Sequence, residues 1–100
     1  MNAIIGFIGV GRMGLPMCRN LARAGYEVIA GDARPERAAD VRAAGACWEG
    51  ETRLVAAAAD VLMTMLPGPE ELREAMVVTI PALRPGTTWI DTTSSSPAVG

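Results

Sequence analysis

The sequence predicts an α/β fold built on a doubly wound parallel sheet. Three observations predict it. Short apolar runs alternate with helical patterns along the 100 residues, and half of the residues are hydrophobic although only four are aromatic, as suits aliphatic strands buried on both faces. A glycine-rich turn, Gly9-Val10-Gly11-Arg12-Met13-Gly14, stands between the first apolar run and the first helical pattern. A turn of this kind at this place is typical of the Rossmann fold, which binds dinucleotides.

The first part of the chain contains two strands and the helix between them. Residues 3–8 (AIIGFI) predict a buried strand, and residues 13–24 predict a helix that Gly25 ends as its C-terminal cap. Residues 26–30 (YEVIA) predict the second strand. One face of the helix is apolar and is formed by Leu15, Cys18, Leu21 and Ala22.

The middle of the chain continues the alternation. A second helix begins at Pro35 and ends at Gly45, and residues 46–48 predict a short third strand. An alanine-rich helix over 52–59 then leads into a fourth strand over 59–66, whose sequence is ADVLMTML. These two strands and the two before them imply right-handed crossovers and a parallel sheet.

The last part of the chain supplies a helix over 70–77 and a fifth strand over 87–91 (TTWID). Residues 78–84 are ambiguous because Pro81 interrupts their helical pattern, and residues 92–100 form a polar turn that leads toward a helix. The expected strand order is 3-2-1-4-5. A sixth strand is not found, so we expect residues 1–100 to be one N-terminal NAD(P)-binding domain, truncated before strand six and incomplete at its C-terminal end.

The glycine turn is the strongest functional signal. Gly9 permits the tight turn, Gly11 lets a pyrophosphate approach the backbone, and Gly14 lets the helix pack closely on the strand. Free N–H groups at the start of the helix would then face the anion. Arg12 and Met13, inside the turn, are further candidates for cofactor contact. The alternatives are a glycine turn that binds nothing and a solvated Arg12.

Asp32 is the candidate for the ribose of the cofactor. It lies 23 residues after Gly9, at the end of the second strand, and the ribose-binding acid of such folds stands about 20 residues on. A carboxylate accepts hydrogen bonds from ribose hydroxyls and repels a 2′-phosphate, so NAD is favoured. NADP stays open because Arg34 and Arg37 follow closely and can pair with a phosphate. The alternative for Asp32 is a cap of the loop.

Composition excludes several classes of function. The net charge is −2 and no basic stripe exists, so nucleic acid is not an expected partner. No apolar run approaches the roughly 20 residues of a membrane span, and neither His nor a paired cysteine motif offers a metal site. Cys18 and Cys47 are expected to be buried thiols in a reducing compartment, which predicts a cytoplasmic protein.

Nearly the whole chain resembles the β-hydroxyacid dehydrogenase family, which includes 3-hydroxyisobutyrate dehydrogenases, tartronate semialdehyde reductases and, more distantly, 6-phosphogluconate dehydrogenases. The segments that carry the resemblance are GFIGVGRMGLPMCRNLARAGYEV, then Asp32 and Pro35, then ADVLMTMLP and finally RPGTTWIDTTSSSP. The resemblance implies an NAD-dependent oxidoreductase that transfers hydride between nicotinamide and a small 3-hydroxy acid. It also implies a homo-oligomer.

The resemblance assigns roles to two further segments. It places Leu66 and Pro67 beside the nicotinamide half of the cofactor, although a Leu-Pro turn that ends a strand is an alternative. It assigns Thr93, Ser94 and Ser95 to the substrate, and Ser94 also to the cofactor. Thr93 and Ser94 are exchanged in type relative to the Ser-Thr of the family, and capping of a following helix is the alternative role.

No catalytic residue is expected within this chain. The catalytic lysine of the family, together with its all-helical second domain, lies beyond Gly100, and the chain contains no lysine. The resemblance therefore implies an activity for a longer protein, and we expect the 100 residues alone to be inactive. Two other functions stay open: an imine reductase or related reductase, and a non-catalytic dinucleotide-binding or assembly module.

Overall fold

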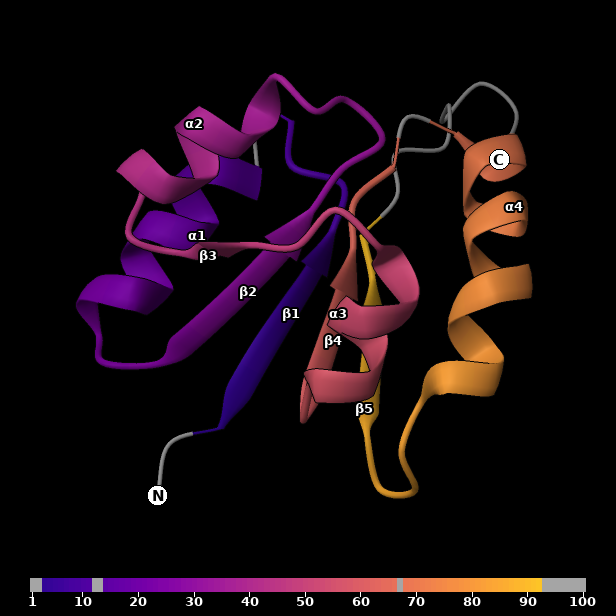
Figure 1. Ribbon diagram of the computed structural model, residues 1–100. Coiled ribbons are helices and arrows are strands. Elements are labelled where there is room, and N and C mark those ends of the chain that lie inside the picture. Colours follow the sequence, from indigo (N-terminus) through magenta and orange to yellow (C-terminus); the bar gives the residue numbers. More distant parts are fainter. Residues whose placement is uncertain (1–2, 12–13, 67, 93–100) are drawn as a thin grey trace.

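The computed structural model describes residues 3–11, 14–66 and 68–92, and these form a parallel sheet with helices on both faces (Figure 1). The described strands are in the order β3-β2-β1-β4-β5, as the sequence predicts. All four neighbouring pairs are parallel. The strands are β1 (Ile4–Ile8), β2 (Glu27–Gly31), β3 (Cys47–Trp48), β4 (Val61–Thr64) and β5 (Thr88–Asp91).

The helices connect these strands, and a glycine follows the end of α1 and of α2. They are α1 (Gly14–Arg23), α2 (Arg37–Ala43), α3 (Thr52–Ala58), α4 (Pro69–Thr79) and the short 3-10 helix η1 (Ile80–Ala82). Gly25 and Gly45 follow α1 and α2 with φ of 99° and 93°, in the left-handed region that glycine adopts without strain. The expected glycine caps of both helices are therefore confirmed.

Two apolar cores lie on opposite faces of the sheet, because successive strand residues point to opposite sides. Phe7 of β1 and Val28 of β2 belong to the core beneath α1 and α2. Ile8 of β1 and Leu62 of β4 belong to the core beneath α3 and α4. Figure 1 shows the same division, with α1 and α2 on one face and α3 and α4 on the other.

Gly6 explains how closely α3 approaches β1. A Cβ at Gly6 would lie 2.9 Å from both the Ala59 Cβ and a methyl group of Val55. Only a residue without a side chain fits between the strand and the helix at this point. The close contact fixes α3 over the centre of the sheet, and the loop before α3 is thereby held at the edge where the strands end.

Three expectations need correction. The fourth strand covers Val61–Thr64, not residues 59–66, because Ala59 and Asp60 form the exit from α3. Beyond the strand, the N–H of Met65 still donates to the carbonyl oxygen of Ile8 over 2.9 Å. The ambiguous residues 78–84 continue α4 to Thr79 and then form η1, where Pro81 occupies the first turn and needs no N–H partner. Cys47 is exposed, since it lies on the edge strand β3, whereas Cys18 is buried as expected. No helix in the described part of the chain is long and apolar enough to cross a membrane.

Candidate dinucleotide-binding site

The glycine turn leaves the carboxyl end of β1 and is tied to β2 at once. The N–H of Gly9 donates to the carbonyl oxygen of Gly31 over 2.8 Å. Gly9 has φ of 90°, and a Cβ there would collide with the carbonyl oxygen of Met65. Glycine is thus required at position 9 by both the backbone conformation and the closeness of the chain that follows β4.

Gly11 differs from Gly9 because no contact with the described residues requires glycine there. A Cβ at Gly11 would meet no atom within 4 Å. Its carbonyl oxygen accepts the hydrogen bond from the N–H of Leu15, 3.2 Å away, that opens α1. The space in front of Gly11 therefore belongs to the cleft, which is the arrangement expected where a ligand approaches a backbone.

Gly14 is buried at the start of α1. A Cβ there would lie 3.4 Å from the carbonyl oxygen of Gly9 and 3.5 Å from the sulfur of Met65, which is ordinary packing distance. Space alone therefore does not demand glycine at position 14. The first turn of α1 carries no acidic residue, so the positive end of its dipole is not neutralised within the helix.

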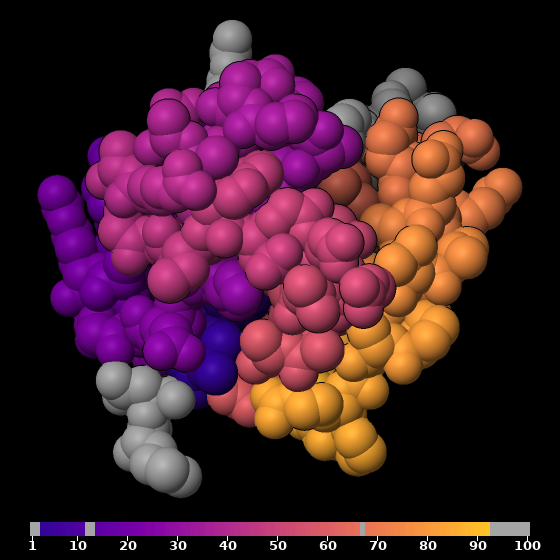
Figure 2. Space-filling view, viewed as in Figure 1, coloured from indigo at the N-terminus to yellow at the C-terminus, as the bar shows by residue number. Residues whose placement is uncertain are grey.

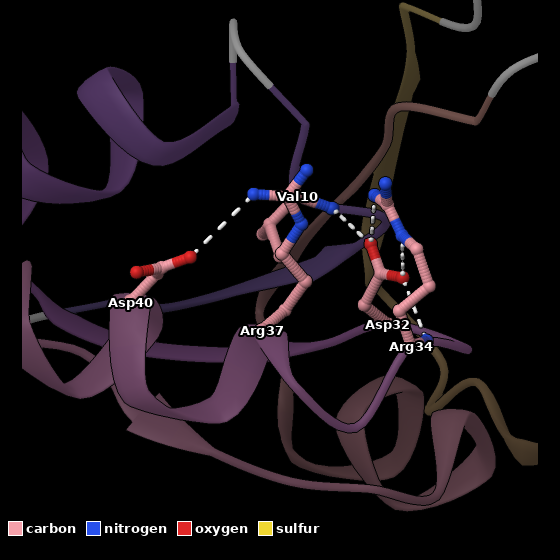
Figure 3. Close-up of polar contacts among 5 residues, drawn as sticks. All are labelled: Val10, Asp32, Arg34, Arg37 and Asp40. Carbon is pink, nitrogen blue, oxygen red and sulfur yellow. Dashed lines mark hydrogen bonds and ion pairs between the residues drawn. The ribbon is translucent and has the colours of Figure 1, made fainter.

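Asp32 follows β2 directly and is buried, and Figure 3 shows the polar contacts of its carboxylate. Its Oδ2 accepts a hydrogen bond of 2.8 Å from the backbone N–H of Val10. The backbone N–H of Arg34 donates to Oδ1 over 2.9 Å. The Arg34 side chain folds back over the carboxylate and donates from Nε to Oδ1 and from Nη2 to Oδ2, over 2.9 and 3.0 Å.

These contacts determine the protonation state of Asp32. Burial raises its pKa, but the hydrogen bonds from the Arg34 side chain and from the backbones of Val10 and Arg34 outweigh burial, so the pKa lies below its usual value. Asp32 is thus a carboxylate at neutral pH. The guanidinium of Arg34 lies between it and solvent, with 47 % of the arginine side chain exposed against 5 % of the aspartate.

A cleft of about 910 Å³ opens above the carboxyl ends of the strands, where open α/β sheets bind ligands. Gly9, Gly11, Gly14 and Asp32 all line it, and so does Leu66 after β4. In Figure 2 the surface is indented between the segment that leads into α3 and helix α4. The cleft has the volume of a small-molecule site. The structure thus brings together the described residues that the sequence predicted for the cofactor.

Several lining residues were missed by sequence reasoning. Residues 50–53, at the start of α3, form one wall, and Glu74, Ala75 and Val78 of α4 form another. Glu71 lines the same wall, and there the family resemblance had implied a contact with the cofactor. The signal for residues 50–53 was available, because they follow the third strand and so must lie at the same edge of the sheet as the ends of β1 and β4. Apart from Glu71, the face of α4 that lines the cleft carried no comparable signal.

Thr64 fixes the far end of the cleft. Its hydroxyl accepts a hydrogen bond from the Trp89 indole over 3.1 Å and donates to Oδ1 of Asp91 over 2.8 Å. Its carbonyl oxygen accepts from the N–H and the hydroxyl of Thr92, at 2.8 and 3.2 Å. Thr92 lines the cleft and immediately precedes the residues expected to bind substrate. Arg12, Met13, Pro67, Thr93, Ser94 and Ser95 lie outside the described residues.

Known proteins resemble this chain over nearly all of its length. Residues 4–99 match the family described as the NAD binding domain of 6-phosphogluconate dehydrogenase. A probable 3-hydroxyisobutyrate dehydrogenase of Mycobacterium tuberculosis is 38% identical over 92 residues, which are 92% of this chain and 31% of that protein. The 2-(hydroxymethyl)glutarate dehydrogenase of Eubacterium barkeri is 38% identical over 94% of this chain and 32% of its own length. The chain thus spans about a third of these relatives.

Solved structures agree in fold. The 3-hydroxyisobutyrate dehydrogenase of Mycobacterium tuberculosis, solved with L-serine, superposes with a TM-score of 0.88 at 38% identity, over 93% of this chain and 32% of that one. An imine reductase of Myxococcus stipitatus with NAD+ has a TM-score of 0.87 over 99% of this chain and 34% of that one, but at 22% identity it supports the fold alone. The match over residues 4–99 and these relatives show that the chain belongs to the β-hydroxyacid dehydrogenase family, and that it corresponds to the NAD-binding domain of the family.

Proposed function

We propose that this chain is the cofactor domain of a dehydrogenase that transfers hydride between nicotinamide and a small 3-hydroxy acid. The observation that carries the proposal is Gly11. Among the described residues no contact requires a glycine there, yet a side chain at this position would stand in the cleft between α1 and the segment that contains Asp32. In the Rossmann fold, a glycine at this position lets the backbone approach the pyrophosphate of the cofactor.

The described residues fit a dinucleotide along the whole cleft. The start of α1 supplies the unneutralised end of a helix dipole for the pyrophosphate. Asp32 lies on the adenosine side and Leu66 on the nicotinamide side, at the ends of β2 and β4. When bound, the cofactor would accept the hydride in oxidation of the hydroxy acid and return it in the reverse reaction, while the chain's own residues would hold the cofactor and position its two halves.

The substrate class rests on the relatives, whose names describe dehydrogenases of 3-hydroxyisobutyrate and 2-(hydroxymethyl)glutarate. Thr93, Ser94 and Ser95 are our candidates for the substrate carboxylate, and Thr64 and Thr92 anchor the segment that leads to them. The family resemblance assigns proton transfer at the hydroxyl to a lysine, and this chain contains neither Lys nor His. We expect no oxidation of hydroxy acids by the 100 residues alone.

Calorimetric titration of the chain with NAD tests the proposal. We expect saturable binding that weakens as ionic strength rises, because an anionic group is being held. A titration with no heat and no change in tryptophan fluorescence at millimolar NAD would remove the basis of the proposal. Hydroxy acids are the control ligand, since without the cofactor we expect them to bind far more weakly.

We also infer a cytoplasmic location and a homo-oligomeric assembly for the protein. Two thiols that form no disulfide, Cys18 and Cys47, suit a reducing compartment. The apolar side chain of Ile90, 42 % exposed on β5 at the edge of the described sheet, suits contact with another chain. Sedimentation of the protein over a range of concentrations measures the assembly directly.

A further inference from the structure

Met65 lies between the glycine turn and the cleft, one residue beyond β4. Among the described methionines, which are Met17, Met63, Met65 and Met76, Met65 is the one that lines the cleft. It is partly buried and packs against the core beneath α1 and α2. The cleft therefore gives a small solute such as hydrogen peroxide a route to this thioether.

The backbone of Met65 is held on both sides. Its N–H donates to the carbonyl oxygen of Ile8 over 2.9 Å. Its carbonyl oxygen lies so close to Gly9 that a Cβ at position 9 would collide with it. Movement of Met65 away from the glycine turn would break the hydrogen bond to β1. A chemical change in the side chain therefore has to be accommodated where the side chain lies.

The sulfur of Met65 lies at the start of α1. It would be 3.5 Å from a Cβ at Gly14, the first residue of that helix. The first turn of α1 has no acidic residue, and the N–H groups of a first turn have no partners within their own helix. A polar oxygen on this sulfur would therefore lie beside the positive end of the helix dipole, where we propose that the pyrophosphate binds.

Oxidation of methionine supplies such an oxygen. In the reaction with hydrogen peroxide, the thioether sulfur loses two electrons, the O–O bond breaks and a sulfur–oxygen bond forms, while the other oxygen leaves as water with both protons. The product, methionine sulfoxide, is a polar side chain in place of an apolar one. Its oxygen carries a partial negative charge and accepts hydrogen bonds, and a phosphate oxygen shares both properties.

We propose that Met65 is a site of oxidative modification that regulates the dinucleotide site. The sulfoxide oxygen takes up space before the start of α1, competes with the pyrophosphate for the N–H groups of the helix, and so weakens cofactor binding. The inference rests on the proposed function, which supplies the ligand. The modification is reversible, because methionine sulfoxide reductases convert the sulfoxide back to the thioether.

The experiment exposes the full chain to hydrogen peroxide with and without NAD, and then to excess thiol, which reverses sulfenic acid formation at the exposed Cys47. Peptide mass spectrometry locates the added oxygen, and calorimetry measures NAD affinity. We expect Met65 to gain one oxygen atom, bound NAD to slow that gain, and the affinity of the oxidised chain to fall by about tenfold or more. The two methionine sulfoxide reductases, one for each epimer, should restore the affinity.

Single variants assign the effect to one residue. Met65→Leu has no sulfur and a similar volume, so peroxide should not change the affinity of this variant from its own starting value. Met17→Leu and Met76→Leu should still respond to peroxide, because neither residue lines the cleft. Met13→Leu tests the other methionine of the glycine turn and should respond as well. If Met65→Leu does not fold, the time course of the wild-type chain decides, since loss of NAD affinity should follow oxidation of Met65 and not of the other methionines.

Each outcome separates the inference from the proposed function. Oxidation of Met65 with unchanged NAD affinity overturns the inference and leaves the cofactor site standing. Loss of NAD affinity in peroxide-treated Met65→Leu also overturns it, since another residue would then be responsible. The same holds if circular dichroism shows that oxidation of Met65 unfolds the chain, because binding would then be lost without competition. If the untreated wild-type chain does not bind NAD, the proposed function and the inference fall together.

Discussion

The backbone N–H of Val10 donates a hydrogen bond of 2.8 Å to Oδ2 of Asp32, so the turn after β1 and the loop after β2 form one unit. The N–H of Gly9 adds a second link, to the carbonyl oxygen of Gly31. Asp32 thus has a structural role that is present before any ligand binds. The ribose-binding role that we propose for Asp32 would come in addition to this one, and the two can be separated experimentally.

Gly11→Val tests the bare position in the turn. We expect its thermal melting temperature to stay within a few degrees of the wild-type value, because a Cβ added at this position meets no described atom within 4 Å and the side chain would extend into the cleft. NAD affinity should fall by at least about a hundredfold, since the methyl groups occupy the place of the pyrophosphate. Circular dichroism and calorimetry measure the two effects.

Gly9→Ala is the matched control for that variant. Its Cβ would strike the backbone of Met65 and its φ would be strained, so it should lose both folding stability and binding. Undiminished NAD binding by Gly11→Val would contradict our assignment of the pyrophosphate to this turn.

Asp32→Ala tests the structural role of the carboxylate. It leaves the buried N–H of Val10 without an acceptor, which costs roughly 1–3 kcal/mol in the free energy of unfolding. Asp32→Asn keeps an oxygen for that N–H and should lose less. Chemical denaturation in urea, monitored by tryptophan fluorescence, measures both variants. Equal stability of Asp32→Ala and the wild-type chain would show that the bond to Val10 contributes nothing.

The same carboxylate predicts a dependence on pH. The pKa of Asp32 is lower in the folded than in the unfolded chain, where it is near 3.8, so folding favours the ionised form. Its contribution to stability is complete above about pH 4 to 5 and is lost as pH falls through the lower, folded pKa. Stability measured in urea between pH 6 and pH 2.5 should fall less steeply in Asp32→Asn than in the wild-type chain. Identical slopes would be inconsistent with the shift.

The two thiols should react at very different rates with a chromogenic disulfide reagent. Cys47 is exposed and should react within the mixing time or shortly after, whereas Cys18 is buried and its pKa is raised to about 11 by burial. Cys18 should react only as the chain unfolds. Cys47→Ser should remove the fast phase alone, and a fast phase that survives in this variant would contradict the buried position of Cys18.

Strand β5 predicts self-association, because it is the outer strand of the described sheet and carries the exposed Ile90. Ile90→Lys should shift the sedimentation profile toward the monomer, since a charge on an edge strand opposes pairing with another chain. Val77→Lys is the control, as Val77 is 73 % exposed and belongs to helix α4, not to a strand of the sheet. A wild-type chain that remains monomeric at millimolar concentration would refute the prediction.

Strand order and the glycine turn were predictable because each depends on local sequence. The alternation of apolar runs and helices, with right-handed crossovers, yields the observed order with β1 at the centre. The ends of the strands and helices were harder to predict. Apolar residues report burial and not backbone pairing, so the run that ends at Leu66 predicts a longer strand than Val61–Thr64. The exposure of Cys47 follows from the shortness of the edge strand β3, which a residue type does not reveal.

The candidate site was likewise predictable only in part. Asp32 was placed by its distance from Gly9, but the return of Arg34 onto its carboxylate was not, because that contact depends on the path of the loop between β2 and α2. A side chain two residues further on can lie toward the carboxylate or away from it with the same sequence. The carboxylate with four donors is a property of the folded loop.

The position of β1 between β2 and β4 has a consequence for synthesis on the ribosome. Once residues 1–50 have emerged from the ribosome, β1, β2 and β3 are available with the helices of one face, but β4 is not yet available to pair with the second edge of β1. The nascent half-domain therefore presents an open strand edge and the uncovered side chain of Ile8. A translational pause that holds residues 50–64 inside the ribosome would lengthen the time for which that edge is accessible to other nascent chains.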